Sequence, residues 1–172
     1  MPSHHQHHRT SVIRPMDESD LDQIVALSLL AWRPVFDSFE KVLGRVIFDR
    51  LYRPDWRTAQ AEAVRATCAA DGADPYVVLT SAGGEVAGFV VLARDPDESL
   101  GVVEMIAVHP KHQRSGHGRH LMSHAVKVFS ADGLALMNVG TGGDPGHAPA
   151  RALYESMGFT GVPLVNYYRA LA

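Results

Sequence analysis

The chain has 172 residues, of which 46% are hydrophobic and 20% are charged, and its formal net charge is −3 at pH 7. This composition excludes an intrinsically disordered chain and a strongly basic nucleic-acid-binding protein, and no apolar run is long enough to span a bilayer. No segment near the start resembles a signal peptide, and Cys68 is the single cysteine. We therefore expect a cytoplasmic protein whose partners include neither nucleic acid nor a membrane.

Histidine is unusually abundant, with ten residues in the chain. The segment 1–10 holds four of them and has no apolar periodicity. We therefore set it apart as a disordered His-rich arm or part of a purification tag, and expect a single domain over 11–172. A natural metal-binding arm has the same composition and is the alternative.

The first part of the domain is predicted to contain one strand followed by helices. A short strand is expected over 11–15, and a helix with a broad apolar face follows it through about Trp32. Pro34 is expected to end or kink this helix. Apolar residues at helical spacing predict a second helix over 38–52 and a third, rich in alanine, over 56–70.

The rest of the chain alternates strands with helices, which predicts an α/β (α+β) domain with a mixed sheet covered by helices. The first two strands are separated by a glycine turn and should form a hairpin. The predicted elements are strands over 76–80, 86–92 and 100–108, a helix over 118–129, a strand over 134–139, a short helix around 150–157, and final strands over 159–160 and 165–171.

The most informative stretch runs from an apolar strand into a glycine-rich loop and then into an amphipathic helix. The loop has the form Q-R-x-G-x-G, from Gln113 to Gly118. The first N–H groups of a helix are unpaired, and its dipole favours negative charge there, so this is an anion site. Gly116 and Gly118 allow a phosphate to approach the backbone, and Arg114 and Arg119 add positive charge. Neither the P-loop nor the Rossmann pattern is matched.

With this loop and one further motif, the sequence resembles the GCN5-related N-acetyltransferase (GNAT) family. The family's acetyl-CoA signature, Q/R-x-x-G-x-G/A, is matched by Gln113, Gly116 and Gly118. A second family element, roughly N-x-x-A-x-x-L-Y-x-x-x-G-F, is matched over 147–159, with a histidine at the first position. The resemblance implies a mixed, mostly antiparallel sheet of about six to seven strands flanked by helices. Its central strand would be splayed to admit acetyl-CoA.

The resemblance also implies acetyl-CoA as the cosubstrate. Backbone groups in the second half of the strand 100–108 would contact the pantetheine arm, and the glycine loop would hold the pyrophosphate. His147 stands where the family often has a cofactor-contacting asparagine, which also caps the helix, although Asp144 can provide this cap instead. The expected cofactor-binding residues are Met105, Ile106, Ala107, Val108, Gln113, Arg114, Ser115, Gly116, His117, Gly118, Arg119 and His147.

Two residues are candidates for catalysis. Tyr154 occupies the place of the family's general acid, which protonates the CoA thiolate, and a tyrosine pKa of about 10 keeps it protonated at neutral pH. The alternative is that Tyr154 only packs on the apolar face of its helix. Glu104 is the only carboxylate in an apolar strand, where burial would raise its pKa and suit it to act as the base. It could instead bind the acceptor's ammonium group.

These features predict an enzyme that transfers acetyl directly to a primary amine of a small molecule or peptide, since Cys68 is not placed as an acyl carrier. Aromatic and acidic residues on the first helices would suit a small cationic acceptor, while a lysine or protein N-terminus is the other acceptor class. These residues are Trp32, Phe36, Asp37, Phe39 and Glu40. The alternative function is a non-catalytic acyl-CoA-binding sensor or scaffold, and a homodimer remains open.

Five further histidines lie within sixteen residues around the glycine loop: His109, His112, His117, His120 and His124. Zinc needs three or four converging ligands, and no cysteine or carboxylate lies among these histidines. We therefore expect no metal site here, and interpret the histidines as a solvated cationic face near the cofactor phosphates.

Overall fold

The computed structural model describes residues 11–80 and 84–171, so the His-rich arm over 1–10 and most of the predicted hairpin turn lie outside it. The bounds of its helices and strands agree with the predicted elements over most of the chain. In order they are β1 (Ile13–Pro15), η1 (Glu18–Asp20), α1 (Leu21–Leu43), α2 (Arg45–Leu51), α3 (Trp56–Cys68), β2 (Asp74–Leu79), β3 (Val86–Asp95), β4 (Leu100–Val108), η2 (Pro110–His112), α4 (His117–Ala131), β5 (Leu136–Val139), η3 (Pro145–His147) and α5 (Ala148–Ser156).

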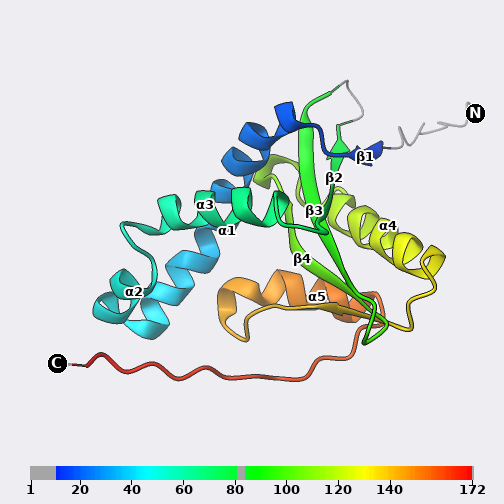
Figure 1. Cartoon of the computed structure of the whole chain (residues 1–172). Helices are drawn as coiled ribbons and strands as arrows, with labels where there is room; N and C mark the ends of the chain where they lie inside the picture. The colour runs from blue at the N-terminus through cyan, green and yellow to red at the C-terminus, as the bar shows by residue number, and fades with distance from the viewer. Residues whose placement is uncertain (1–10, 81–83, 172) are drawn as a thin grey trace, which may run out of the picture.

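The sheet has the strand order β1-β2-β3-β4-β5, and its first four strands are antiparallel neighbours (Figure 1). Only β5 runs parallel to its neighbour β4. The mixed, mostly antiparallel sheet is therefore confirmed, but the expected six to seven strands are wrong, since the described ranges contain five. The missing strands were predicted over 159–160 and 165–171, which form no strand and pair with none in the described part of the chain.

The first helix differs from its prediction, because α1 continues through Pro34 and ends only at Leu43. Gly44 ends it by adopting a φ of +73°, a left-handed conformation that glycine enters without a steric penalty. A proline removes one helical hydrogen bond. Val35 and Phe36 are buried directly after it, so tertiary packing holds the helix together at this point.

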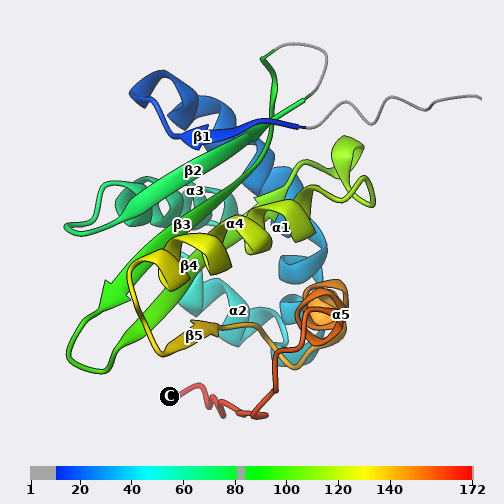
Figure 2. The ribbon, with the colours of Figure 1, turned by 90° about the vertical axis from the view of Figure 1, so that its right-hand side faces the viewer.

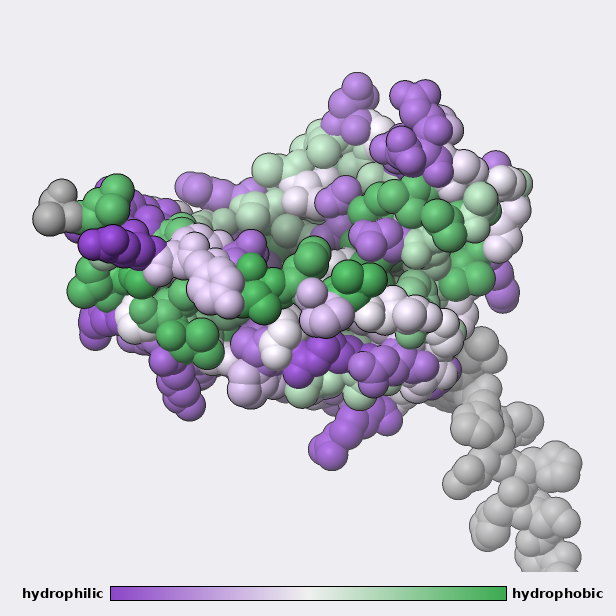
Figure 3. All heavy atoms as spheres, turned by 90° about the horizontal axis from the view of Figure 1, so that it is seen from below, coloured by the Kyte–Doolittle hydropathy of each residue, from purple (hydrophilic) through white to green (hydrophobic). Residues whose placement is uncertain are grey.

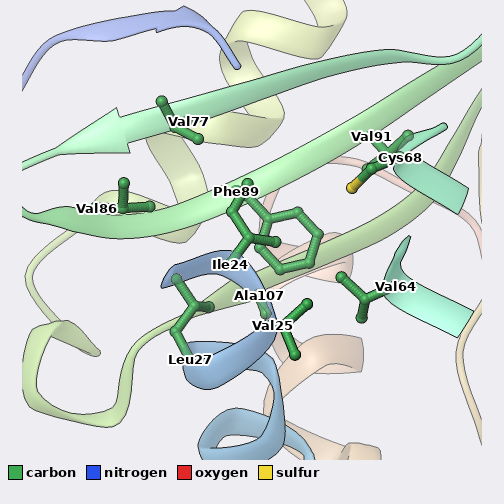
Figure 4. Packing of buried hydrophobic residues seen from close by; sticks show 10 residues of the cluster. All are labelled: Ile24, Val25, Leu27, Val64, Cys68, Val77, Val86, Phe89, Val91 and Ala107. Carbon is green, nitrogen blue, oxygen red and sulfur yellow. The ribbon is translucent and has the colours of Figure 1, made fainter. Parts of the chain in front are cut away.

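Two apolar layers cover the two faces of the sheet (Figures 1 and 2). On one face, side chains from α1 and α3 pack around Phe89 of β3, as Figure 4 shows. On the other face, α4 and α5 pack on the residues of β3 and β4 that point the opposite way. Cys68 belongs to the first layer as a free, buried residue.

Candidate active site

The central strand β4 is splayed from β5, as the sequence predicts. The two strands pair only as far as Val103 and Val139. On the other side of β4, Val91 pairs with Met105 while Leu92 pairs with Val103, so Glu104 has no partner and forms a bulge. Beyond the bulge, the β5-facing edge of β4 has no partner strand among the described residues.

A cleft of about 610 Å³ lies at this point of separation. Its walls come from α1, the second half of β4, the glycine loop and α5. The predicted site residues that line it are Ile106, Ala107, Val108, Gln113, Arg114, Gly116, Gly118, Arg119, His147 and Tyr154. Four predicted residues do not line it, namely Glu104, Met105, Ser115 and His117.

The α1 wall of the cleft was only partly foreseen. Trp32 lines the cleft as expected, but Ala31, Pro34 and Val35 line it too. These residues were missed because the helix was expected to end near Trp32, whereas the observed helix continues along the cleft. Their only signal in the sequence is the apolar face of α1.

The loop before α4 is shaped to present backbone N–H groups. Arg114 and Gly116 both have positive φ, 60° and 85°, and α4 begins at the next residue, His117. In the described structure, the N–H groups of 114–119 donate no hydrogen bond. The side chain of Gln113 donates to the carbonyl oxygen of Val108 at 3.1 Å, so it ties the loop to the end of β4. This geometry is compatible with the anion site that the sequence predicts, which stays a prediction.

Three of the five histidines around this loop do not fit the expected solvated cationic face. The rings of His109 and His112 lie 5.6 Å apart, and those of His112 and His117 lie 6.2 Å apart. Burial, followed by nearby like charges, lowers the pKa of His109, His117 and His124, which keeps these side chains mostly neutral at pH 7. Among the residues with described positions, no three His, Cys, Asp or Glu side chains gather closely enough to hold a metal ion.

His147 lines the cleft and forms a hydrogen-bonded pair with Asp144, and both side chains are largely buried. Burial alone would raise the pKa of the Asp144 carboxyl, but hydrogen bonds from Ser38 and His147 outweigh it and hold the pKa below its usual value. Nδ1 of His147 contacts Asp144, while Nε2 has no hydrogen-bond partner in the described part of the chain. Asp144 therefore fixes the orientation of the imidazole ring.

A close approach between this loop and α1 holds the pair in place. The N–H of Gly146 donates to Oγ of Ser38 at 3.2 Å and to Oδ2 of Asp144 at 2.9 Å. A Cβ atom at Gly146 would lie 2.9 Å from Cα of Val35, so only glycine fits here. Arg151 also donates to the carbonyl oxygen of Asp144 at 2.8 Å. No local pattern in the sequence pointed to these contacts.

Tyr154 reaches the cleft from α5 and is only 7% exposed. Burial raises the pKa of its phenol to about 12, so the side chain keeps its proton throughout the physiological range. Its ring packs against Phe159, with the ring centroids 6.0 Å apart. The side chain of Glu104, in contrast to that of Tyr154, is exposed. Glu104 lies on the bulge, and the expectation that it is buried is therefore wrong.

The aromatic residues of α1 divide between the core and the cleft. Phe36 is buried in a cluster, stacked on Trp56 at 4.5 Å and edge-on to Tyr52 at 5.0 Å. Phe39 connects this cluster to the site, with its ring 5.4 Å from that of His147. Asp37 and Glu40, which were also expected near the acceptor, are exposed on α1.

The fold and the cleft define a class of α/β proteins in which an anion-binding loop lies where two strands of the sheet part. Within this class, the chain belongs to the acetyltransferase (GNAT) family, whose sequence profile matches residues 44–159. Comparison with curated protein sequences gives no significant match. No helix within residues 11–80 and 84–171 is both long and apolar enough to cross a membrane.

Solved structures of acetyltransferases share the fold. The ribosomal-protein-S18-alanine N-acetyltransferase of Escherichia coli has 21% identity and a TM-score of 0.63, over 89% of this chain and 79% of its own. AAC(6')-Iy in complex with a CoA bisubstrate analogue has 18% identity and a TM-score of 0.61, over 95% of this chain and 99% of its own. The aminoglycoside 6'-N-acetyltransferase AAC(6')-IG of Acinetobacter haemolyticus has 16% identity and a TM-score of 0.62, over 94% and 99%.

Proposed function

We propose that this protein transfers the acetyl group of acetyl-CoA directly to a primary amine of a small molecule or peptide. GNAT proteins are generally acetyl-CoA-dependent N-acetyltransferases. The observation that carries the proposal is the joint placement of the anion-binding loop, the splayed half of β4 and Tyr154 around one cleft.

The cofactor would lie along the opened strand. The backbone N–H groups of 114–119 would hold the pyrophosphate, with Arg114 and Arg119 adding positive charge. Arg119 is already held by a hydrogen bond of 2.7 Å to Oγ of Ser156. The backbone groups of 105–108 that face away from β3 would hold the pantetheine arm, which places the thioester toward Tyr154.

In the reaction, the amine nitrogen attacks the thioester carbonyl carbon, a C–N bond forms and the C–S bond breaks. Tyr154 gives its phenolic proton to the departing thiolate. Nε2 of His147 takes the proton that the amine loses, since Asp144 fixes the opposite nitrogen of the ring. Glu104 lies exposed on the bulge, which suits it better to attract the acceptor's ammonium group than to move a proton.

Among the similar structures, one is named for a ribosomal-protein alanine and one for an aminoglycoside, so their names include both acceptor classes. Calorimetry with acetyl-CoA tests the cofactor, and we expect saturable binding at micromolar to millimolar concentrations. A thiol-release assay would then compare aminoglycosides and polyamines with peptides that carry a free N-terminus or a lysine. No binding of acetyl-CoA at millimolar concentration contradicts the proposal, whereas binding without thiol release by any acceptor favours the alternative of a sensor or scaffold.

Replacing His147 by asparagine tests the base role. We expect acetyl-CoA affinity to stay within about threefold, because the glycine loop and the opened edge of β4 that would hold the cofactor are unchanged, and turnover to fall about tenfold or more, because an amide cannot take a proton. The variant for comparison with His147→Asn is Glu104→Gln. It removes the charge that attracts the acceptor, so it should raise KM for a cationic acceptor and leave kcat unchanged. Full turnover in His147→Asn, measured by thiol release, would remove His147 from the base role.

A further inference from the structure

Pro34 interrupts the hydrogen-bond ladder of α1 at the wall of the cleft. In an α-helix, the carbonyl of one residue accepts from the N–H of the residue four positions later, and a proline has no N–H to donate. The carbonyl of Leu30 therefore lacks its usual helical donor. Outside the helix, no backbone N–H in the described part of the chain donates to it. This carbonyl points along the helix toward Pro34, so its oxygen lies beside a residue that lines the cleft.

The α1 wall of the cleft has no polar side chain that accepts a hydrogen bond. Its lining residues are Ala31, Trp32, Pro34 and Val35. The indole N–H of Trp32 only donates, and the other three side chains have no polar atom. The neighbouring carbonyls of the helix are paired with N–H groups inside it. The carbonyl of Leu30 is therefore the hydrogen-bond acceptor that this wall can present to a ligand.

Carboxylates do not take over this task at the cleft. Among the described residues that line it, none is an aspartate or a glutamate. Asp144 is engaged by His147 and by the N–H of Gly146. Residues 161–171 extend along the lower face of the molecule, with Arg169 as their only charge, and Figure 3 shows their exposed apolar side chains in a band across this surface. An amine inside the cleft thus meets backbone oxygen at the α1 wall.

α1 lies on the side of the sheet opposite to the glycine loop. α4 and α5 pack on one face of the sheet, and α1 packs on the other. The cleft has walls from both faces, because it lies where β4 and β5 separate. A cofactor whose pyrophosphate is held at the loop would reach through this opening, so its acetyl group would approach α1. The acceptor amine would then meet the acetyl group beside Pro34.

We propose that the carbonyl oxygen of Leu30, left free by Pro34, binds the acceptor amine and makes the site selective for primary amines. This inference rests on the proposed function. A neutral primary amine has one lone pair and two N–H groups. The lone pair attacks the thioester carbon, one N–H gives its proton to Nε2 of His147, and the second N–H donates to the carbonyl of Leu30. That second N–H stays on the nitrogen of the amide product, and a secondary amine lacks it.

Pro34→Ala tests this role, because alanine supplies the missing N–H and pairs the carbonyl of Leu30 inside the helix. Thiol release is measured with the primary amine that turns over fastest among aminoglycosides, polyamines and peptides, and with its N-methylated analogue. We expect kcat/KM for the primary amine to fall about fivefold, the effect of one lost hydrogen bond, and the preference over the N-methylated amine to shrink by the same factor. Acetyl-CoA affinity, measured by calorimetry, should change by less than about twofold.

Two further variants separate the added N–H from the lost proline ring. Lactic acid in place of Pro34, joined through an ester bond, removes the ring without adding an N–H, so it should keep the parental preference for the primary amine. Pro96→Ala removes a proline from the exposed turn between β3 and β4 and should behave like the parent. In urea unfolding, Pro34→Ala should be at least as stable as the parent, because its helix gains a hydrogen bond. A loss of activity then does not come from misfolding.

A carbonyl signal reports the same hydrogen bond without turnover. Carbon-13 in leucine carbonyls and nitrogen-15 in alanine amides restrict the correlation spectrum to the Leu-Ala pairs at 30–31, 92–93, 134–135 and 171–172. With CoA present, adding the amine should shift the signal of Leu30 in the parent but not in Pro34→Ala, and the signal of Leu134 should stay in place. An unresponsive Leu30 signal, or parental selectivity in Pro34→Ala, would overturn this inference while thiol release continues. Absence of thiol release with every amine would instead contradict the proposed function.

Discussion

Replacement of Tyr154 by phenylalanine is expected to lower turnover about 100-fold, while acetyl-CoA affinity changes by less than about twofold. The phenol reaches the cleft from α5 and keeps its proton because burial raises its pKa to about 12. Removing the hydroxyl removes this proton source but leaves the ring packed against Phe159. Thiol release measures turnover, and calorimetry measures affinity. Unchanged turnover would leave Tyr154 with a packing role only.

Tyr76→Phe is the matched control for this variant. Tyr76 is also partly buried, but its hydroxyl donates to Asp74 at 3.1 Å and it does not line the cleft. Turnover should therefore stay at the parental level. The raised pKa also sets the pH dependence, since an acid with an ordinary tyrosine pKa of about 10 would begin to lose its proton above about pH 9. Because its pKa is about 12, Tyr154 should cause no fall in turnover between about pH 9 and about pH 10.

Replacement of Gly101 by alanine is expected to reduce the free energy of unfolding by about 3 kcal/mol. A Cβ atom at this position of β4 would lie 2.6 Å from Cδ1 of the Phe129 ring and closer still to other ring atoms. Neither side yields easily, because Phe129 is buried and Gly101 is paired with both β3 and β5. Urea unfolding followed by circular dichroism measures the change.

Gly140→Ala controls for the general effect of removing a glycine. A Cβ atom at Gly140 would meet no atom within 4 Å, so this variant should lie within about 0.5 kcal/mol of the parent. When Phe129→Leu is combined with Gly101→Ala, the double variant should recover part of the stability that Gly101→Ala loses, because the smaller side chain leaves room for the methyl group. If Gly101→Ala is as stable as Gly140→Ala, the close approach of a Cβ atom to Phe129 does not destabilise the protein.

Local patterns were sufficient for much of the fold. The apolar run over 100–108 predicted β4 with its observed bounds, and the glycine loop predicted where α4 begins to within one residue. The same reasoning failed at Pro34, where the local cost of a proline suggested a break. Packing of Val35 and Phe36 outweighs that cost, and the break falls at Gly44 instead.

The amino-acid sequence by itself determined the family, the glycine loop that precedes α4 and the place of Tyr154 on the last helix, because each depends on residues close together in the chain. Only the tertiary structure decided that Glu104 is exposed on a bulge, and that His147 pairs with Asp144 beside α1. It also decided that residues 161–171 form no strand with any other residue that the structure describes. A bulge depends on the register between strands, and a buried pair or a strand depends on what lies opposite it. These are properties of distant segments, and the local pattern of residues does not contain them.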